Sequence, residues 1–202
     1  MIIFAGRYIP LLAPHFEKGL LMARLPTLEQ SQMSDRQKQV YDVIATGKRG
    51  NVRGPLAIWL HRVDLADKAQ ALGQYCRYDS SLAPRLSELA ILTTARIWDA
   101  TFEWQAHLSP ALAAGLNPSV IDSLSADEHP IFAAEDEALV YEFTRELNIN
   151  RGVSDELYER VFSILGKAGV VDLVGILGYY ALISMTIKTF DIDPILVDEG
   201  EY

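Results

Sequence analysis

The residues best suited to chemistry in this 202-residue chain are Glu103 and His107. They lie four positions apart, which places both side chains on one face of a helix. A carboxylate beside an imidazole raises its pKa and orients its ring, and a histidine that titrates near neutral pH can give and take a proton. We expect Pro110 to end this helix soon after His107, so that the helix dipole also favours imidazolium. The spacing alone favours a simpler alternative, an ion pair on a solvated helix surface.

A third acidic residue, Glu88, lies inside an apolar run that extends from Leu86 to Leu92. Arg85 precedes it by three positions and shares its helix face, so the two could form a surface ion pair. The alternative is a partly buried carboxylate with a partner on another element. The local sequence leaves both readings open.

Helices must position these groups, because hydrophobic residues recur at helical spacing along most of the chain. Ser34 begins a capping-box pattern, Pro84 suits a first helical turn, and Asn117 precedes another such proline. The pattern predicts helices over about 35–46, 65–76, 84–98, 101–108, 118–124, 134–147, 155–165 and 170–190. Asp64 is the expected N-cap of the second. No segment alternates with a period of two residues, so the predicted fold class is all-α.

The predicted helix 170–190 is apolar enough to raise the question of a membrane span. Asp172 near its start, together with Gly175 and Gly178, argues against that reading. We therefore expect a buried core helix or a helix between subunits, and no membrane partner. Its small residues would allow another helix to approach closely.

The overall composition excludes several classes of protein. The net charge is −9, and the densest basic group (Lys48, Arg49 and Arg53) is short, so nucleic acid is not an expected partner. Cys76 is the single cysteine, which excludes an intramolecular disulfide and a CxxC redox pair. The four histidines are far apart in sequence, so no metal site is predicted. We expect a cytoplasmic protein.

The predicted domain organisation is simple. Residues 1–22 are apolar in patches but are interrupted by Arg7, Pro10 and Pro14, which does not suit a signal peptide. We interpret them as a loosely ordered N-terminal extension. Residues 23–202 are predicted to form one domain.

Residues 87–116 (SELAILTTARIWDATFEWQAHLSPALAAGL) resemble the carboxymuconolactone decarboxylase-like family, within the alkyl hydroperoxidase D-like superfamily. The shared pattern is a Glu-Leu-x-x-Leu helix, a short break, and a second helix with a histidine, followed by Gly-Leu. Here these are Glu88-Leu89 with Leu92, the break near Trp98, His107, and Gly115-Leu116. The resemblance extends over residues 23–190 and implies an alkyl hydroperoxidase D-like helical bundle.

The peroxidase branch of that superfamily carries Cys-x-x-Cys-x-x-x-His, and its two cysteines fall here on Ala100 and Glu103. The resemblance therefore implies the thiol-free decarboxylase branch, with Glu88, Glu103 and His107 as catalytic residues. It implies cofactor-free acid–base chemistry on a small carboxylated lactone or related acid, as in aromatic compound catabolism. We expect a substrate-binding set of one guanidinium, for a carboxylate, and three aromatic side chains: Arg96, Trp98, Trp104 and Tyr78.

Two alternatives stay open at this stage. One is peroxide reduction, which the missing thiols disfavour. The other is a non-catalytic helical oligomer that binds a ligand. A buried pocket at the three residues would favour catalysis, whereas an exposed Glu103–His107 pair would favour the oligomer. The resemblance also implies a homo-oligomer, as a dimer, trimer or hexamer.

Overall fold

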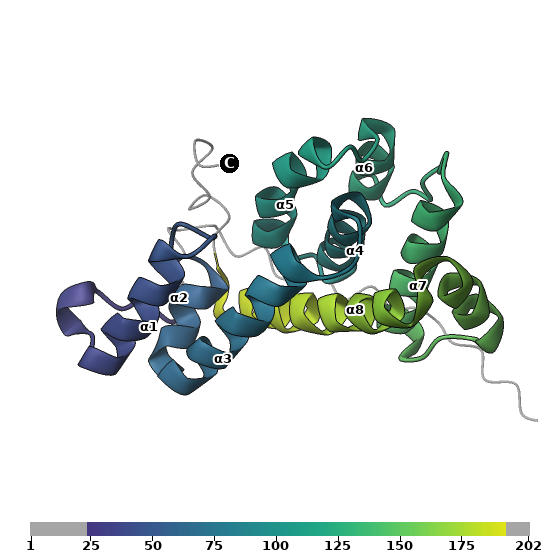
Figure 1. Ribbon diagram of the computed structural model, residues 1–202. Helices are drawn as coiled ribbons and strands as arrows, with labels where there is room; N and C mark the ends of the chain where they lie inside the picture. Colours follow the sequence, from purple (N-terminus) through teal and green to yellow (C-terminus); the bar gives the residue numbers. More distant parts are fainter. Residues whose placement is uncertain (1–23, 193–202) are drawn as a thin grey trace, which may run out of the picture.

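The computed structural model describes residues 24–192, and all regular structure among them is helical. The helices that Figure 1 labels are α1 (Asp35–Thr46), α2 (Pro55–Trp59), α3 (Val63–Gln74), α4 (Pro84–Ile97), α5 (Thr101–Ala113), α6 (Pro118–Ser125), α7 (Glu135–Asn150) and α8 (Asp155–Phe190). Three short turns complete the order: the 3₁₀ turns η1 (Gln30–Gln32) and η2 (Leu60–Arg62), and the π-helical turn η3 (Tyr75–Asp79). The all-α prediction is confirmed.

Helix α4 is the centre of the fold. Its residues from Leu86 to Ala95 are all buried, because α5, α7 and α8 pack around it. Figure 1 shows α8 as a long rod beneath α4, with α1–α3 at one end and α7 at the other. A carboxylate in the middle of α4, such as Glu88, must therefore find a partner inside the protein.

Helix α8 is long and apolar enough to cross a membrane, but 61% of its most apolar window is buried inside the molecule. It packs against α4, α7 and η3. This is the environment of a core helix, which agrees with one of the two alternatives that the sequence left for residues 170–190. The helix contains a break at Gly166, whose φ of 64° and ψ of −176° are not helical. The predicted separation of 155–165 from 170–190 corresponds to that break.

Two local expectations were wrong. Helix α5 does not end near His107 but continues through Pro110 to Ala113. Proline removes only one hydrogen bond from the helix, and the turn that follows is fixed by the buried residues Ala111 and Leu116. His107 thus lies more than a turn from the helix C-terminus, where the helix dipole has little effect. In addition, α3 begins at Val63, so Asp64 lies in its first turn and is not its N-cap.

The capping prediction at Ser34 is confirmed, because its side chain and that of Gln37 form a complete capping box. The buried apolar residues of the described chain form one hydrophobic core, from Met33 to Ile192. The proposed extension, residues 1–22, lies outside the described residues.

Candidate active site

A buried histidine lies between two carboxylates where α4 and α5 pack together. His107 Nδ1 is 2.6 Å from Glu88 Oε2, and its Nε2 is 2.9 Å from Glu103 Oε1. The relative exposure is 1% for His107, 7% for Glu88 and 5% for Glu103. We call these three residues the triad. Both alternatives that placed these carboxylates at a solvated surface are wrong.

The two carboxylates reach the imidazole for different reasons. Glu103 precedes His107 by one helical turn on α5, so the pair follows from the i,i+4 geometry of the helix. Glu88 comes from the neighbouring helix, nineteen positions away, because α4 and α5 lie against each other. Arg85 does not pair with Glu88; it bonds Asp136 and Glu137 of α7 instead. Of the two readings that the sequence left open for Glu88, the pair with Arg85 is wrong and the buried carboxylate with a partner on another element is confirmed.

The pKa of His107 is raised above its ordinary value of 6.5. Burial alone would lower it, but the charge of Glu88 and the hydrogen bonds to Glu103 and Glu88 outweigh burial. Imidazolium can donate from both nitrogens at once, which matches two carboxylate acceptors. The triad is therefore arranged to hold a proton near neutral pH.

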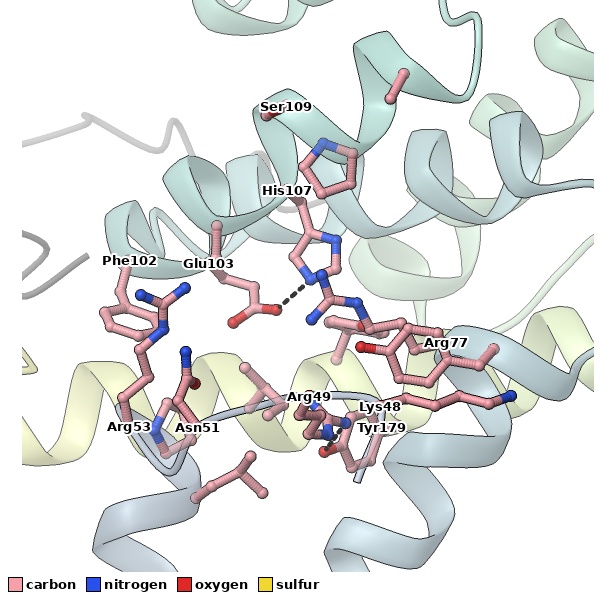
Figure 2. A pocket seen from close by; sticks show the side chains of 18 residues that line it. Lys48, Arg49, Asn51, Arg53, Arg77, Phe102, Glu103, His107, Ser109 and Tyr179 are labelled. Atoms are coloured by element: carbon pink, nitrogen blue, oxygen red, sulfur yellow. Dashed lines mark hydrogen bonds and ion pairs between the residues drawn. The ribbon is translucent and has the colours of Figure 1, made fainter. Parts of the chain in front are cut away.

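A cavity of about 360 Å³ opens beside the triad, and Glu103 and His107 are in its wall (Figure 2). In Figure 2, one oxygen of Glu103 is joined to His107 while its other oxygen points away, towards the side of Arg53 and Asn51. Glu88 is not among the lining residues. Glu103 is thus the carboxylate that meets the cavity, and Glu88 holds His107 from behind.

The rest of the cavity wall is strongly basic, with Lys48, Arg49, Arg53 and Arg77 among its lining residues. In a chain of net charge −9 this is a local reversal of sign, which favours an anionic ligand. Arg77 also balances the triad: burial alone would lower its pKa, but nearby phenols and the Glu88 and Glu103 carboxylates raise it overall. The guanidinium therefore stays charged.

Aromatic side chains supply the apolar part of the wall. Tyr180 meets the His107 ring edge-on with centroids 5.1 Å apart, and the Tyr179 hydroxyl accepts a 3.3 Å hydrogen bond from Arg49. Burial raises the pKa of Tyr179 to about 12 and that of Tyr180 well above its ordinary value, so both phenols stay protonated. Within residues 24–192 the Tyr180 hydroxyl has no hydrogen-bond partner.

Two glycines allow this wall to close. Gly54 begins α2 with φ of +54°, and a side chain there would overlap the ring of Phe102, which lines the cavity. A side chain on Gly73 would overlap Tyr179 and Arg49. Both positions need the absence of a Cβ atom.

The structure brings together four of the seven residues predicted for the site. Glu88, Glu103 and His107 form the triad, and Tyr78 lines the cavity. The other three lie elsewhere. Arg96 bonds the carbonyl oxygen of Leu124, Trp98 bonds Asn148, and Arg96 and Trp104 line a different hollow. Arg96 and Trp98 lie at the end of α4, and Trp104 is next to Glu103 on α5 but is not among the residues that line the cavity.

Most of the basic wall was not predicted from the sequence. Lys48, Arg49 and Arg53 form a basic run that is too short for nucleic acid, but a short basic run between two helices also suits a small anion. No local signal marks Arg77 or Tyr180. His61 does not line the cavity, and its Nε2 lies 2.8 Å from the carbonyl oxygen of Pro26.

No group of three or more histidine, cysteine, aspartate or glutamate side chains in the described part of the chain is arranged to hold a metal ion. The buried cysteine, Cys76, is not among the residues that line the cavity.

No family model and no curated protein matches this sequence. Its structure is similar to the crystal structure of an uncharacterized peroxidase-related protein from Silicibacter sp. TM1040. The TM-score is 0.70, and the match covers 91% of this chain and 99% of that chain at 14% sequence identity. At this identity the likeness shows the fold alone, an all-α bundle. It does not test the predicted decarboxylase-like family.

Proposed function

We propose that this protein is a cofactor-free acid–base enzyme that acts on a small carboxylated substrate, such as a lactone or a keto acid. The observation that carries the proposal is the buried imidazole held at both nitrogens by carboxylates, in the wall of a basic cavity. Perturbed titratable groups that converge on a cavity are typical of active sites.

Glu103 is the group that exchanges a proton with the substrate. His107 Nε2 is already bonded to Glu103, so a proton held on the imidazole reaches the cavity through that carboxylate. Glu88 fixes the orientation of the ring through Nδ1 and stabilises its charged form. This division of work assigns a separate role to each carboxylate, as acid–base catalysis requires.

In a decarboxylation, the bond between the substrate carbon and its carboxylate breaks and carbon dioxide leaves. The electron pair moves onto an adjacent carbonyl oxygen, which gives an enolate. The nearby cations Arg49 and Arg77 would stabilise this negative charge. Glu103 then delivers the proton from His107 to the carbon, and solvent restores the proton to the triad.

The same cations explain why the substrate should be acidic. Guanidinium groups bind carboxylates with two parallel hydrogen bonds, and three arginines and a lysine surround this cavity. Their charge also attracts anions to a protein whose overall charge would repel them. Residue Tyr78 contributes an apolar face at the rim.

The alternatives are less well supported. Peroxide reduction by a dithiol needs two cysteines, and the sequence has only Cys76, which is buried. A non-catalytic oligomer was expected to expose the Glu103–His107 pair, which is instead buried at a cavity. A decarboxylase-type lyase remains our preferred assignment.

We further propose that the protein is a cytoplasmic homo-oligomer. The outward face of α8 exposes Val171, Val174 and Met185 beside Gly178, which is an apolar surface suited to a second helix. Replacement of Val174 by arginine would then reduce the mass measured by light scattering.

A screen of small lactones and keto acids tests the proposal. The wild-type protein should turn over at least one of them, and His107→Gln should lose about 10²–10⁴-fold in rate. Glutamine is preferred to alanine, because alanine would leave two buried carboxylates without a partner. Equal rates for the wild type and His107→Gln would contradict the proposal.

A further inference from the structure

Asp172 is an acidic residue in the most apolar helix of the protein, and its carboxylate is buried. Its relative exposure is 7%, within a turn of the buried residues Val170 and Leu173. A buried carboxylate is costly unless it is hydrogen-bonded. Its partners therefore indicate why the helix contains it.

Those partners are Tyr75, the first residue of the π-helical turn η3, and Ser81, two positions after its last residue. Asp172 Oδ1 accepts a 2.5 Å hydrogen bond from the Tyr75 hydroxyl. Its Oδ2 accepts bonds from the backbone N–H of Ser81, at 2.7 Å, and from the Ser81 hydroxyl, at 2.6 Å. The hydrogen bonds hold the pKa of Asp172 below its ordinary value even though burial acts to raise it. One carboxylate thus fastens both ends of the turn.

The segment between these two anchors carries part of the cavity wall. Arg77 and Tyr78 line the cavity from η3, and Cys76 points into the core with 1% exposure. Asp79, the last residue of η3, forms a 2.7 Å ion pair with Lys48, which is another lining residue. A π-helical turn is an uncommon backbone form that is frequent at functional sites.

We propose that Asp172 is a positioning residue, which holds η3 in place and thereby aims Arg77 at the anion in the cavity. The second half of this proposal, the binding of an acidic ligand by Arg77, rests on the function proposed above. The first half, the fastening of η3, stands on the three hydrogen bonds.

The protein contains its own reporter for the fastening, because Cys76 is its single cysteine and lies inside the fastened turn. In Asp172→Asn the charge is lost and only one oxygen can still accept, so the charge-assisted bonds from Tyr75 and Ser81 are weakened. The reaction of Cys76 with a thiol reagent in the native protein should become about tenfold faster, since loss of a charge-assisted bond favours local opening by about that factor.

Two further variants separate the bonds from the charge. Burial raises the pKa of the Cys76 thiol, and the charge of Asp172 raises it further. Tyr75→Phe and Ser81→Ala each remove hydrogen bonds to Asp172 but keep that charge. Both should also accelerate the thiol reaction, by less than Asp172→Asn. Asp67→Asn is the matched control: it removes an acid paired with Arg36 on the surface of α3 and should leave the thiol rate unchanged.

Calorimetric titration with benzoate tests the aiming of Arg77. Both Asp172→Asn and Arg77→Gln should weaken benzoate binding by about tenfold, and the double variant should be no weaker than Arg77→Gln alone. Of these two single variants, Asp172→Asn should accelerate the reaction of Cys76 with the thiol reagent, and Arg77→Gln should not. With a substrate from the screen, Asp172→Asn should raise KM by about the same factor and should also lower kcat, because Arg77 stabilises the enolate as well as the bound carboxylate.

The outcomes are distinguishable. An unchanged thiol rate in Asp172→Asn, Tyr75→Phe and Ser81→Ala overturns the fastening. A faster thiol reaction with wild-type benzoate affinity in Asp172→Asn overturns the aiming of Arg77. If the wild type binds no benzoate and turns over no acid, the proposed function fails, and the aiming of Arg77 fails with it. The thiol rates then still decide the fastening.

Discussion

Helix α4 carries two clusters of charged side chains that look alike in sequence and differ in the structure. Arg85 bonds Asp136 and Glu137 on α7, with N–O distances of 2.7 Å for both ion pairs. Glu88, one turn further along α4, bonds His107 on α5. The first cluster pairs a permanent cation with two carboxylates, whereas the second pairs an imidazole that can lose its charge.

The difference separates a structural ion pair from a chemical site. The guanidinium of Arg85 has a pKa far above the range in which proteins work, so its cluster holds one charge state. The imidazole of His107 has a pKa raised above its ordinary value of 6.5 by the two carboxylates, but it can still lose its charge, and its second carboxylate opens onto a cavity. Two acidic residues around one cation are therefore not enough to define a site. The nature of the cation and access to a cavity decide it.

Among the residues that do not line the cavity, Glu88 is expected to have the largest effect on turnover. Glu88→Gln removes the charge that orients His107, and the loss of such a carboxylate costs about 10²–10⁴-fold in rate in hydrolase triads. The variant should remain folded, because glutamine can still bond Nδ1. Steady-state rates together with a circular dichroism spectrum check both statements, and a variant with more than half of the wild-type rate would contradict the role of Glu88.

Arg85→Gln should show the reverse behaviour. It leaves Glu137, which is buried, without its cation, and we expect a loss of about 1–3 kcal/mol in the free energy of unfolding. Turnover per folded molecule should stay within about twofold of the wild type, since Arg85 does not contact the triad. Urea unfolding measures the first quantity. A large loss of rate in the folded variant would place the two clusters in one network.

The two clusters should also respond to opposite ends of the pH range. The pKa of His107 is raised on folding, so its contribution to stability is complete below the unfolded value of 6.5 and is lost as pH rises through the folded value. The pKa of Asp136 is lowered by its bond to Arg85, so its contribution is present above 3.8 and is lost as pH falls. Unfolding free energies of wild type and His107→Gln should converge as pH rises. A constant difference would contradict the assignment of the titration to His107.

The smallest effects are expected at the residues that the structure places elsewhere. Arg96→Ala and Trp104→Phe should change kcat/KM by less than about twofold, because both side chains line a separate hollow. Tyr78, by contrast, lies at the cavity rim, so Tyr78→Phe is the variant with which these two are compared. A tenfold loss in Arg96→Ala would restore the carboxylate-binding role that the sequence suggested for it.

Most of the fold could be predicted from the sequence, because its signals are local. The capping box at Ser34, the first-turn prolines Pro84 and Pro118, and the helical spacing of apolar residues each depend on a few neighbouring positions. Helix ends were less predictable. Pro110 was expected to end α5, but tertiary packing outweighed the loss of one hydrogen bond.

The site was only partly predictable, since its contacts join distant segments. The Glu103–His107 pair follows from spacing within one helix, and the family resemblance placed Glu88 beside it. Neither source locates Arg77, which lines the cavity from η3. The hydrogen bonds between that segment and Asp172 of α8 join residues more than ninety positions apart. Helical spacing also does not tell which residues of α4 and α5 face the cavity at the triad. Arg96 and Trp104, which were predicted for that cavity, line a separate hollow.

The most direct test of the acid–base site is the turnover of Glu103→Gln on a carboxylated substrate found in the screen. Glutamine has nearly the same size and can still bond His107, so the fold and the cavity should persist while the carboxylate that meets the substrate is lost. The predicted result is a fall in kcat of about 10²–10⁴-fold with an unfolding midpoint close to that of the wild type. A folded Glu103→Gln protein with wild-type kcat would contradict the central claim.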